Sequence, residues 1–182
     1  ALRPLVERQQ AALGQIALVG TLTARLGMYQ FDERLVVYGL AATQGFKDAL
    51  AEKMPDVKFD EQNAAGDAAT CVTITSKFAA DGVDLILANA TPALQAAAAA
   101  TTEIPVLGTA VTDYATALEI SDWSGTVGTN VSGTSDLAPL DQQADMLHDL
   151  FPDAKNVGLL YCSAEPNSVY QCDTIEGYQV KE

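Results

Sequence analysis

Two short polar segments have the residue types and positions expected of anion-binding loops. Residues 89–92 read Asn-Ala-Thr-Pro and follow the apolar run 83–88, whereas residues 163–168 read Ser-Ala-Glu-Pro-Asn-Ser and follow the apolar run 157–161. In each segment a proline stands where a helix would begin, a position that suits its fixed φ and its missing N–H. The first turn of a helix offers unpaired N–H groups and a partial positive charge. Both segments therefore predict a place for a carboxylate.

A third polar segment, Thr112-Asp113-Tyr114, follows the apolar run 104–107. Asp113 and Glu165 are the carboxylates that can accept hydrogen bonds from an ammonium group. Tyr114 is the aromatic residue best placed to flank an apolar side chain of a ligand, and it can equally pack beneath the loop. Taken alone, each of these residues also fits an ordinary cap or turn. The candidate ligand-binding residues are Asn89, Thr91, Pro92, Thr112, Asp113, Tyr114, Ser163, Glu165, Asn167 and Ser168.

Helical and extended patterns alternate from about Gly39 onward, which predicts an α/β fold with a parallel sheet. Asp67 is expected to cap a helix that Gly82 ends. The nearly continuous apolar run that contains Leu85-Ile86-Leu87 is typical of a central strand covered by helices on both faces. Thr91 is expected as the N-cap of the next helix, with Pro92 as its first residue.

The alternation then starts again, which predicts a second, similar unit. Apolar residues at helical spacing predict a helix over 137–151, residues 157–161 predict a second central strand, and Pro166 is expected to open a helix. The expected organisation is a first α/β lobe over residues 28–133 and the beginning of a second, incomplete lobe over 134–182. Residues 1–27 receive no assignment.

Composition excludes several classes of function. The net charge of −14 repels phosphate backbones, so nucleic acid is not an expected partner. The apolar stretch from Gly14 to Leu22 is shorter than the roughly 20 residues a membrane-spanning helix needs. It also lacks the flanking features of a secretory signal. No glycine-rich phosphate-binding pattern follows a predicted strand, so no nucleotide cofactor is expected.

The three cysteines and the single histidine give no sign of a metal centre or a catalytic pair. Cys71, Cys162 and Cys172 lack Cys-x-x-Cys spacing, and His148 lies on the polar side of its predicted helix. A two-cysteine racemase of α/β type would need one reactive thiol at a strand end in each lobe. Cys162 meets that requirement, but Cys71 is expected on an apolar helix face, where a thiolate is disfavoured. An enzyme is therefore not the preferred interpretation.

Motifs distributed over residues 41–178 resemble one protein family. They are Ala42-Thr43-Gln44-Gly45-Phe46-Lys47-Asp48-Ala49-Leu50, Gln62-Asn63-Ala64 with Gly66-Asp67, Asp84 to Ala93, Ile104-Pro105-Val106, Gly108 to Tyr114, Asn130 to Asp136, Leu150 to Ala154 and Glu165-Pro166-Asn167-Ser168. Together they resemble the ABC transporter substrate-binding family that includes the tryptophan/tyrosine-binding lipoproteins of Gram-positive bacteria.

The resemblance implies a type I periplasmic-binding fold, in which two Rossmann-like lobes close on a small ligand, and it favours an aromatic amino acid. It places ligand contacts in Asn89 to Ala93, Thr112-Asp113 and Ser163 to Ser168. It also implies a membrane permease as partner and an extracellular lipoprotein or periplasmic location. The opening strand is expected at Met28 to Phe31, although the loop after it departs from the family pattern. An extracytoplasmic sensing domain of the same fold remains the alternative.

Overall fold

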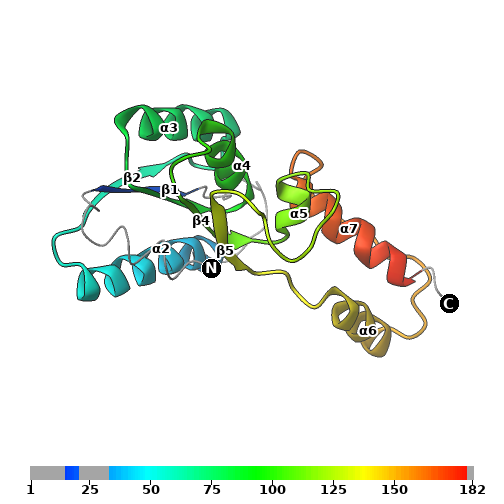
Figure 1. Ribbon diagram of the computed structural model, residues 1–182. Helices are drawn as coiled ribbons and strands as arrows, with labels where there is room; N and C mark the ends of the chain where they lie inside the picture. Colours follow the sequence, from blue (N-terminus) through cyan, green and yellow to red (C-terminus); the bar gives the residue numbers. More distant parts are fainter. Residues whose placement is uncertain (1–14, 21–32, 180–182) are drawn as a thin grey trace.

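The computed structural model describes residues 15–20 and 33–179. Five strands, all parallel to their neighbours, form one sheet: β1 (Gln15–Gly20), β2 (Lys58–Asn63), β3 (Leu85–Asn89), β4 (Val106–Val111) and β5 (Val131–Ser135). Their order across the sheet is β2-β1-β3-β4-β5 (Figure 1). The predicted parallel α/β fold, with Leu85 to Leu87 on a central strand, is therefore confirmed.

The sheet opens at β1, earlier in the chain than expected. Ile16 pairs with Phe59 of β2 on one side and with Leu85 of β3 on the other. β1 lies inside the segment 1–27, for which the sequence made no assignment. The expected opening strand, Met28 to Phe31, lies outside the described residues.

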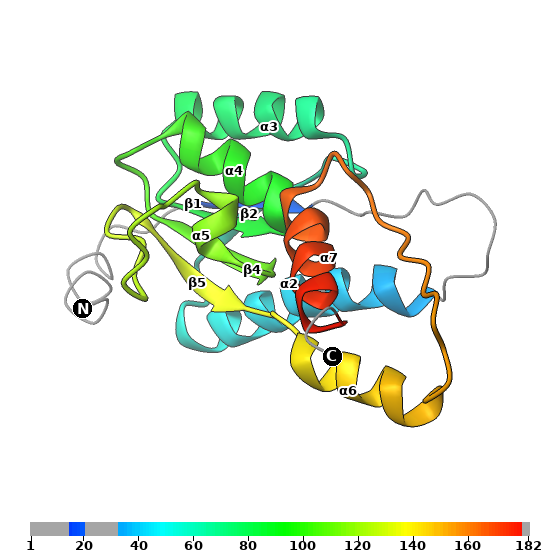
Figure 2. The same ribbon diagram turned by 90° about the vertical axis from the view of Figure 1, so that its right-hand side faces the viewer.

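Helices cover both faces of the sheet. Helices α3 (Ala68–Asp81) and α4 (Thr91–Ala100) lie on one face, and α2 (Glu33–Lys53) lies on the other (Figures 1 and 2). Because successive residues of a strand point to opposite faces, Ile86 is buried under α3 and α4 with Phe78 and Leu94, whereas Leu87 packs with Phe46 on the α2 side. The continuous apolar run of β3 follows from this two-sided burial.

Helix α3 begins and ends at the predicted residues. The Asp67 carboxylate accepts a hydrogen bond from the backbone N–H of Thr70 at 2.7 Å. At the other end, Gly82 adopts the left-handed conformation (φ 66°, ψ 43°), and its N–H donates to Ala79 O. Both ends of α3 were therefore encoded locally.

Two helices lie beside the sheet rather than over it. Helix α6 (Leu140–Leu150) packs against α7 (Pro166–Gln179), and α7 lies beside the short helix α5 (Tyr114–Ala117) (Figure 2). Helix α7 opens at Pro166, as predicted. The helix expected over 137–151 is shorter at its N-terminus.

The prediction of a strand at 157–161 is wrong, because residues 151–165 form neither helix nor strand. A parallel strand exists only through hydrogen bonds to a neighbouring strand, and none of the described residues supplies one there. The apolar side chains of this segment are consequently exposed, Leu160 at 93% and Tyr161 at 50%.

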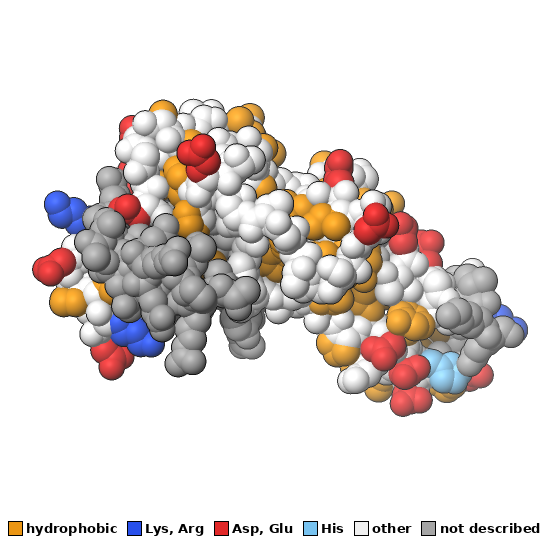
Figure 3. All heavy atoms as spheres, viewed as in Figure 1, with side chains coloured by type: hydrophobic (Ala, Val, Ile, Leu, Met, Phe, Trp, Pro, Cys, Tyr) orange, Lys and Arg blue, Asp and Glu red, His pale blue; other side chains and the backbone are white. Residues whose placement is uncertain are grey.

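On α6, acidic side chains surround His148 beside exposed apolar ones (Figure 3).

Candidate functional site

The carboxyl ends of β2, β3 and β4 lie on one edge of the sheet, and each strand leads into a helix. Carboxylates cap two of these helices: Asp67 accepts from Thr70 N in α3, and Asp113 Oδ2 accepts from Thr116 N at 2.7 Å in α5. Among the described residues no side chain caps α4, whose N-cap residue is Ala90. The N-terminus of α4 therefore keeps its positive potential and is the end best suited to an anion.

The start of α4 corrects the sequence prediction by one residue. Thr91 is not the N-cap; Thr91 and Pro92 are the first two residues of the helix, and Ala90 precedes them. The Ala90 N–H still donates to Thr109 O of β4 at 2.9 Å, so the strand ladder extends to this residue before the chain turns. The turn gives Ala90 φ 82° and ψ 158°, a region used mainly by glycine that costs other residues ~1–3 kcal/mol.

Asn89 and Thr91 form the base of the candidate site. They are buried, with exposed fractions of 5% and 3%. The Asn89 side chain donates from Nδ2 to Thr43 Oγ1 of α2 at 3.0 Å. This bond ties the carboxyl end of β3 to the helix on the opposite face of the sheet and fixes the residue that precedes the α4 turn.

The loop formed by Thr112 and Asp113 is fastened to the end of β5. Ser135 Oγ donates to the carbonyl oxygen of Thr112 at 2.8 Å, and the Asp136 N–H donates to Val111 O at 3.0 Å. Asp113 uses Oδ2 as the cap of α5, which leaves its second carboxylate oxygen to accept a hydrogen bond from a cation.

Tyr114 is buried, with an exposed fraction of 8%. Its hydroxyl donates to Thr134 O of β5 at 3.3 Å. Burial raises the pKa of Tyr114 to about 12, and the nearby negative charge of Asp136 acts in the same direction. Of the two roles that the sequence allowed, this environment favours packing beneath the loop.

The segment 163–168 lies at the start of α7. Both Ser168 N and Val169 N donate to the carbonyl oxygen of Glu165, and Ser168 Oγ donates to Glu165 Oε2 at 3.3 Å. The side-chain oxygen of Asn167 is buried and has no hydrogen-bond partner among the described residues. A buried acceptor without a partner is costly, so this oxygen marks a place where a donor can be accommodated.

The structure brings four of the predicted residues, Asn89, Thr91, Thr112 and Asp113, to the ends of the neighbouring strands β3 and β4. The remaining group, at the start of α7, belongs to a helix that lies beside α5 in both ribbon views (Figures 1 and 2). All three predicted segments thus occur on the same side of the molecule, at or beside the carboxyl edge of the sheet.

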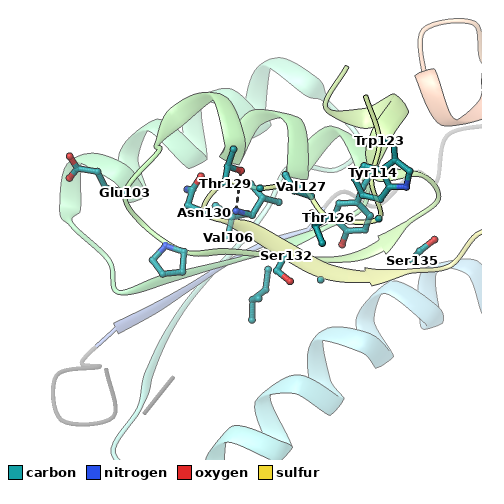
Figure 4. A pocket seen from close by; sticks show the side chains of 16 residues that line it. Glu103, Val106, Tyr114, Trp123, Thr126, Val127, Thr129, Asn130, Ser132 and Ser135 are labelled. Carbon is teal, nitrogen blue, oxygen red and sulfur yellow. Dashed lines mark hydrogen bonds between the residues drawn. The ribbon is translucent and has the colours of Figure 1, made fainter. Parts of the chain in front are cut away.

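Sequence reasoning did not identify a cleft of about 840 Å³ along β5. Its walls come from the loop 123–130 and from β4 and β5, with Trp123 and Tyr114 at one end and Glu103 at the other (Figure 4). Trp123 is 43% exposed. Because the loop 123–130 consists mainly of small and polar residues without a periodic pattern, no local signal could have placed it over β5.

The cysteines do not form the pair that a racemase would need. Cys71 is fully buried, and burial raises the pKa of its thiol, with the Asp67 carboxylate acting in the same direction. Cys162 is exposed. Within residues 15–20 and 33–179, no cluster of acidic, histidine and cysteine side chains is arranged to hold a metal ion. Nor does this part of the chain contain a helix long and apolar enough to cross a membrane.

The fold and the site define one Rossmann-like lobe of the periplasmic-binding class. The family model described as ABC transporter substrate binding protein matches residues 38–182. The chain belongs to this family.

Individual relatives agree with the family match. The chain is similar to a tyrosine-binding protein of Clostridioides difficile, with 41% identity over 144 residues that cover 77% of this chain and 41% of that protein. It is also similar to the crystal structure of an ABC domain in complex with L-Trp from Streptococcus pneumoniae, with 32% identity, a TM-score of 0.77, and coverage of 92% of this chain and 54% of that chain.

A third relative is the ligand-free, open structure of a substrate-binding protein with adhesive properties from Clostridium difficile. It has 35% identity and a TM-score of 0.64, and the match covers 93% of this chain and 54% of that chain. The chain thus spans about half the length of the relatives it matches.

Proposed function

We propose that this chain is part of an extracytoplasmic solute-binding protein of an ABC importer, and that it binds an amino acid, most favourably an aromatic one. The observation that carries the proposal is the N-terminus of α4 at the carboxyl edge of the sheet, which no side chain of the described residues caps, whereas carboxylates cap α3 and α5. Its unpaired N–H groups and partial positive charge suit the ligand carboxylate. The relatives named for tyrosine and crystallised with L-Trp support the choice of an aromatic amino acid.

The roles of the other residues follow from their chemistry. Thr91 donates its hydroxyl to the carboxylate, and Asn89 holds the turn before it. Asp113 accepts from the ligand ammonium through the oxygen that does not cap α5, and Glu165 is the second acceptor. Asn167 offers its buried side-chain oxygen, which no described residue hydrogen-bonds, from the α7 side, together with Ser163 and Ser168. No residue in this arrangement performs covalent chemistry, so the proposal is a binding protein and not an enzyme.

The proposed organisation has two lobes that meet at the site. The sheet with α2 to α5 forms the first, and α6 and α7 begin the second, with the division expected at residue 134 falling at the end of β5. The partner would be a membrane permease, which receives the amino acid. The proposed location is extracellular or periplasmic, with attachment as a lipoprotein in the first case.

The experiment is calorimetric titration of the chain with L-tryptophan and L-tyrosine. Thr91→Ala and Asp113→Asn should each weaken binding by about ten- to a hundredfold, which is the loss of ~1.5–3 kcal/mol from a hydrogen bond to a charged group. Asp67→Asn is the matched control for Asp113→Asn, because Asp67 caps α3 in the same way and is not among the proposed ligand-binding residues. Thr102→Ala, an exposed threonine after the far end of α4, is the control for Thr91→Ala. Equal affinities in the site variants and their controls would refute the proposed site.

A further inference from the structure

We infer that Tyr114 is a positioning residue, which fastens the Thr112-Asp113 loop to the end of β5, from which the chain leaves for α6. This inference rests on the proposed function, because it concerns how the proposed ammonium acceptor is held. It assigns Tyr114 no contact with the ligand. It also implies that the binding loop and the start of the inter-lobe connection move as one unit.

The first observation is the fit of the Tyr114 side chain against two glycines. A methyl group added at Gly108 of β4 or at Gly133 of β5 would overlap the Tyr114 hydroxyl oxygen. At Gly108 the same methyl group would also lie 3.1 Å from Tyr114 Cζ and 3.2 Å from Leu94 Cδ1. The ring end therefore occupies space that exists only because both neighbouring strands carry glycine at the point of contact.

The second observation is the set of hydrogen bonds around this contact. The Tyr114 hydroxyl donates to Thr134 O, Ser135 Oγ donates to Thr112 O, and Asp136 N donates to Val111 O. Residues 134–136, at the end of β5 and just after it, are thus hydrogen-bonded to the stretch 111–114, which includes Asp113. The side chains of Val111 and Tyr114 are both buried in the core, and Tyr114 also makes its hydrogen bond through that side chain, so it anchors the other contacts.

The third observation is where the chain goes next. The segment 136–139 after β5 leads directly into α6, which packs against α7. Any rearrangement of α6 and α7 relative to the sheet must bend this connection. Tyr114 contacts the end of β5, where this connection begins. The position of Asp113 is therefore coupled to the direction in which the connection leaves the sheet.

Hydrogen exchange of the full chain without ligand tests the anchor directly. Tyr114→Leu removes the ring from between the two glycines, and Tyr114→Phe keeps the ring but removes the hydroxyl. We expect the amides of Thr116 and Asp136 to exchange at least tenfold faster in Tyr114→Leu and by a smaller factor in Tyr114→Phe. The Ile86 amide, which donates to Pro105 O in the sheet interior, should be accelerated by a clearly smaller factor than these two amides, because it reports the loss of global stability alone. Tyr161→Phe, at an exposed tyrosine, is the matched control and should change none of these rates.

Two results would overturn the inference: unchanged exchange of Thr116 and Asp136 in both variants, or a uniform increase that includes Ile86, which would indicate general destabilisation. If Tyr114→Leu does not fold, Tyr114→Phe decides by the same criterion. Titration with L-tryptophan separates the two proposals. Faster exchange at Thr116 and Asp136 together with severalfold weaker binding in Tyr114→Phe supports both the positioning role of Tyr114 and the proposed function. If the exchange pattern is the same but the unsubstituted chain does not bind L-tryptophan, the proposed function is contradicted and the positioning role of Tyr114 is still supported.

Discussion

The contact between Tyr114 and Gly108 gives a prediction that can be worked out from single atoms. In Gly108→Ala the new methyl group overlaps the Tyr114 hydroxyl oxygen and lies 3.1 Å from Cζ and 3.2 Å from Leu94 Cδ1. Overpacking of this kind costs ~1–3 kcal/mol, and the direct overlap places this variant in the upper part of that range. Tyr114→Phe alone removes one long hydrogen bond, for a loss of ~0.5–1.5 kcal/mol.

The double variant should be less destabilised than the sum of the two single variants. Without the hydroxyl oxygen, the methyl group meets only the two contacts above 3 Å, which small shifts of the ring and of Leu94 relieve. We therefore expect the loss of stability in the double variant to be about 1–2 kcal/mol smaller than the sum of the two single losses, a coupling within the range seen for residues in contact. Urea-induced unfolding of the four proteins measures each free energy.

Two further glycines serve as controls. In Gly133→Ala the methyl group also overlaps the carbonyl oxygen of Gly108 and lies 2.7 Å from its nitrogen, so removing the Tyr114 hydroxyl should give little rescue. In Gly45→Ala, within α2, the methyl group meets nothing within 4 Å, and the change should stabilise the protein by ~0.5–1 kcal/mol. Additive losses in Gly108→Ala/Tyr114→Phe, with no rescue, would show that the tyrosine ring does not occupy this space.

Three other predictions follow from individual side chains. The protonated form of Tyr114 is favoured in the folded protein, so the free energy of unfolding should fall as pH rises from about 10 through about 12. The absorbance of tyrosinate should show a late-titrating group that Tyr114→Phe abolishes, and persistence of this group in the variant would contradict the burial of Tyr114. The hydrogen bonds from Thr70 lower the pKa of Asp67, so the stability that its carboxylate contributes should be fully present above pH 3.8, the ordinary pKa, and should be lost as pH falls below that value. Asp67→Asn should flatten the acid side of the curve of stability against pH, and an unchanged curve would argue against the cap. A thiol reagent should modify exposed Cys162 in the native protein and reach Cys71 only after unfolding, so rapid native labelling of Cys71 would contradict its place in the core.

The features that the sequence predicted well depend on short-range chemistry. The cap at Asp67 and the left-handed stop at Gly82 each require only a few neighbouring residues. The central position of β3 follows from an apolar run that only burial on both faces explains. The grouping of Asn89, Thr91, Thr112 and Asp113 follows in turn, because parallel strands end on the same edge of their sheet.

The features that the sequence did not predict depend on partners distant in the chain. The apolar run at 157–161 has the pattern of a strand, but a strand needs a neighbour that the described residues do not provide. The N-cap position of Ala90 depends on the hydrogen bond from its N–H to Thr109 O across the sheet. The anchor at Tyr114 needs glycines from two other strands, and no pattern around residue 114 indicates them. Strand β1 lies within the apolar stretch from Gly14 to Leu22, whose composition alone does not distinguish a buried strand from part of a membrane or signal segment.

The central claim is that an amino-acid carboxylate binds at the start of α4, and amide chemical shifts during titration with L-tryptophan test it most directly. We expect the largest chemical-shift changes at the backbone amides of Thr91, Ala93 and Asp113, with smaller changes at the start of α7. Pro92, which has no N–H, gives no signal of its own. Chemical-shift changes confined to Trp123 and the cleft along β5, with none at Thr91 and Ala93, would contradict carboxylate binding at the start of α4.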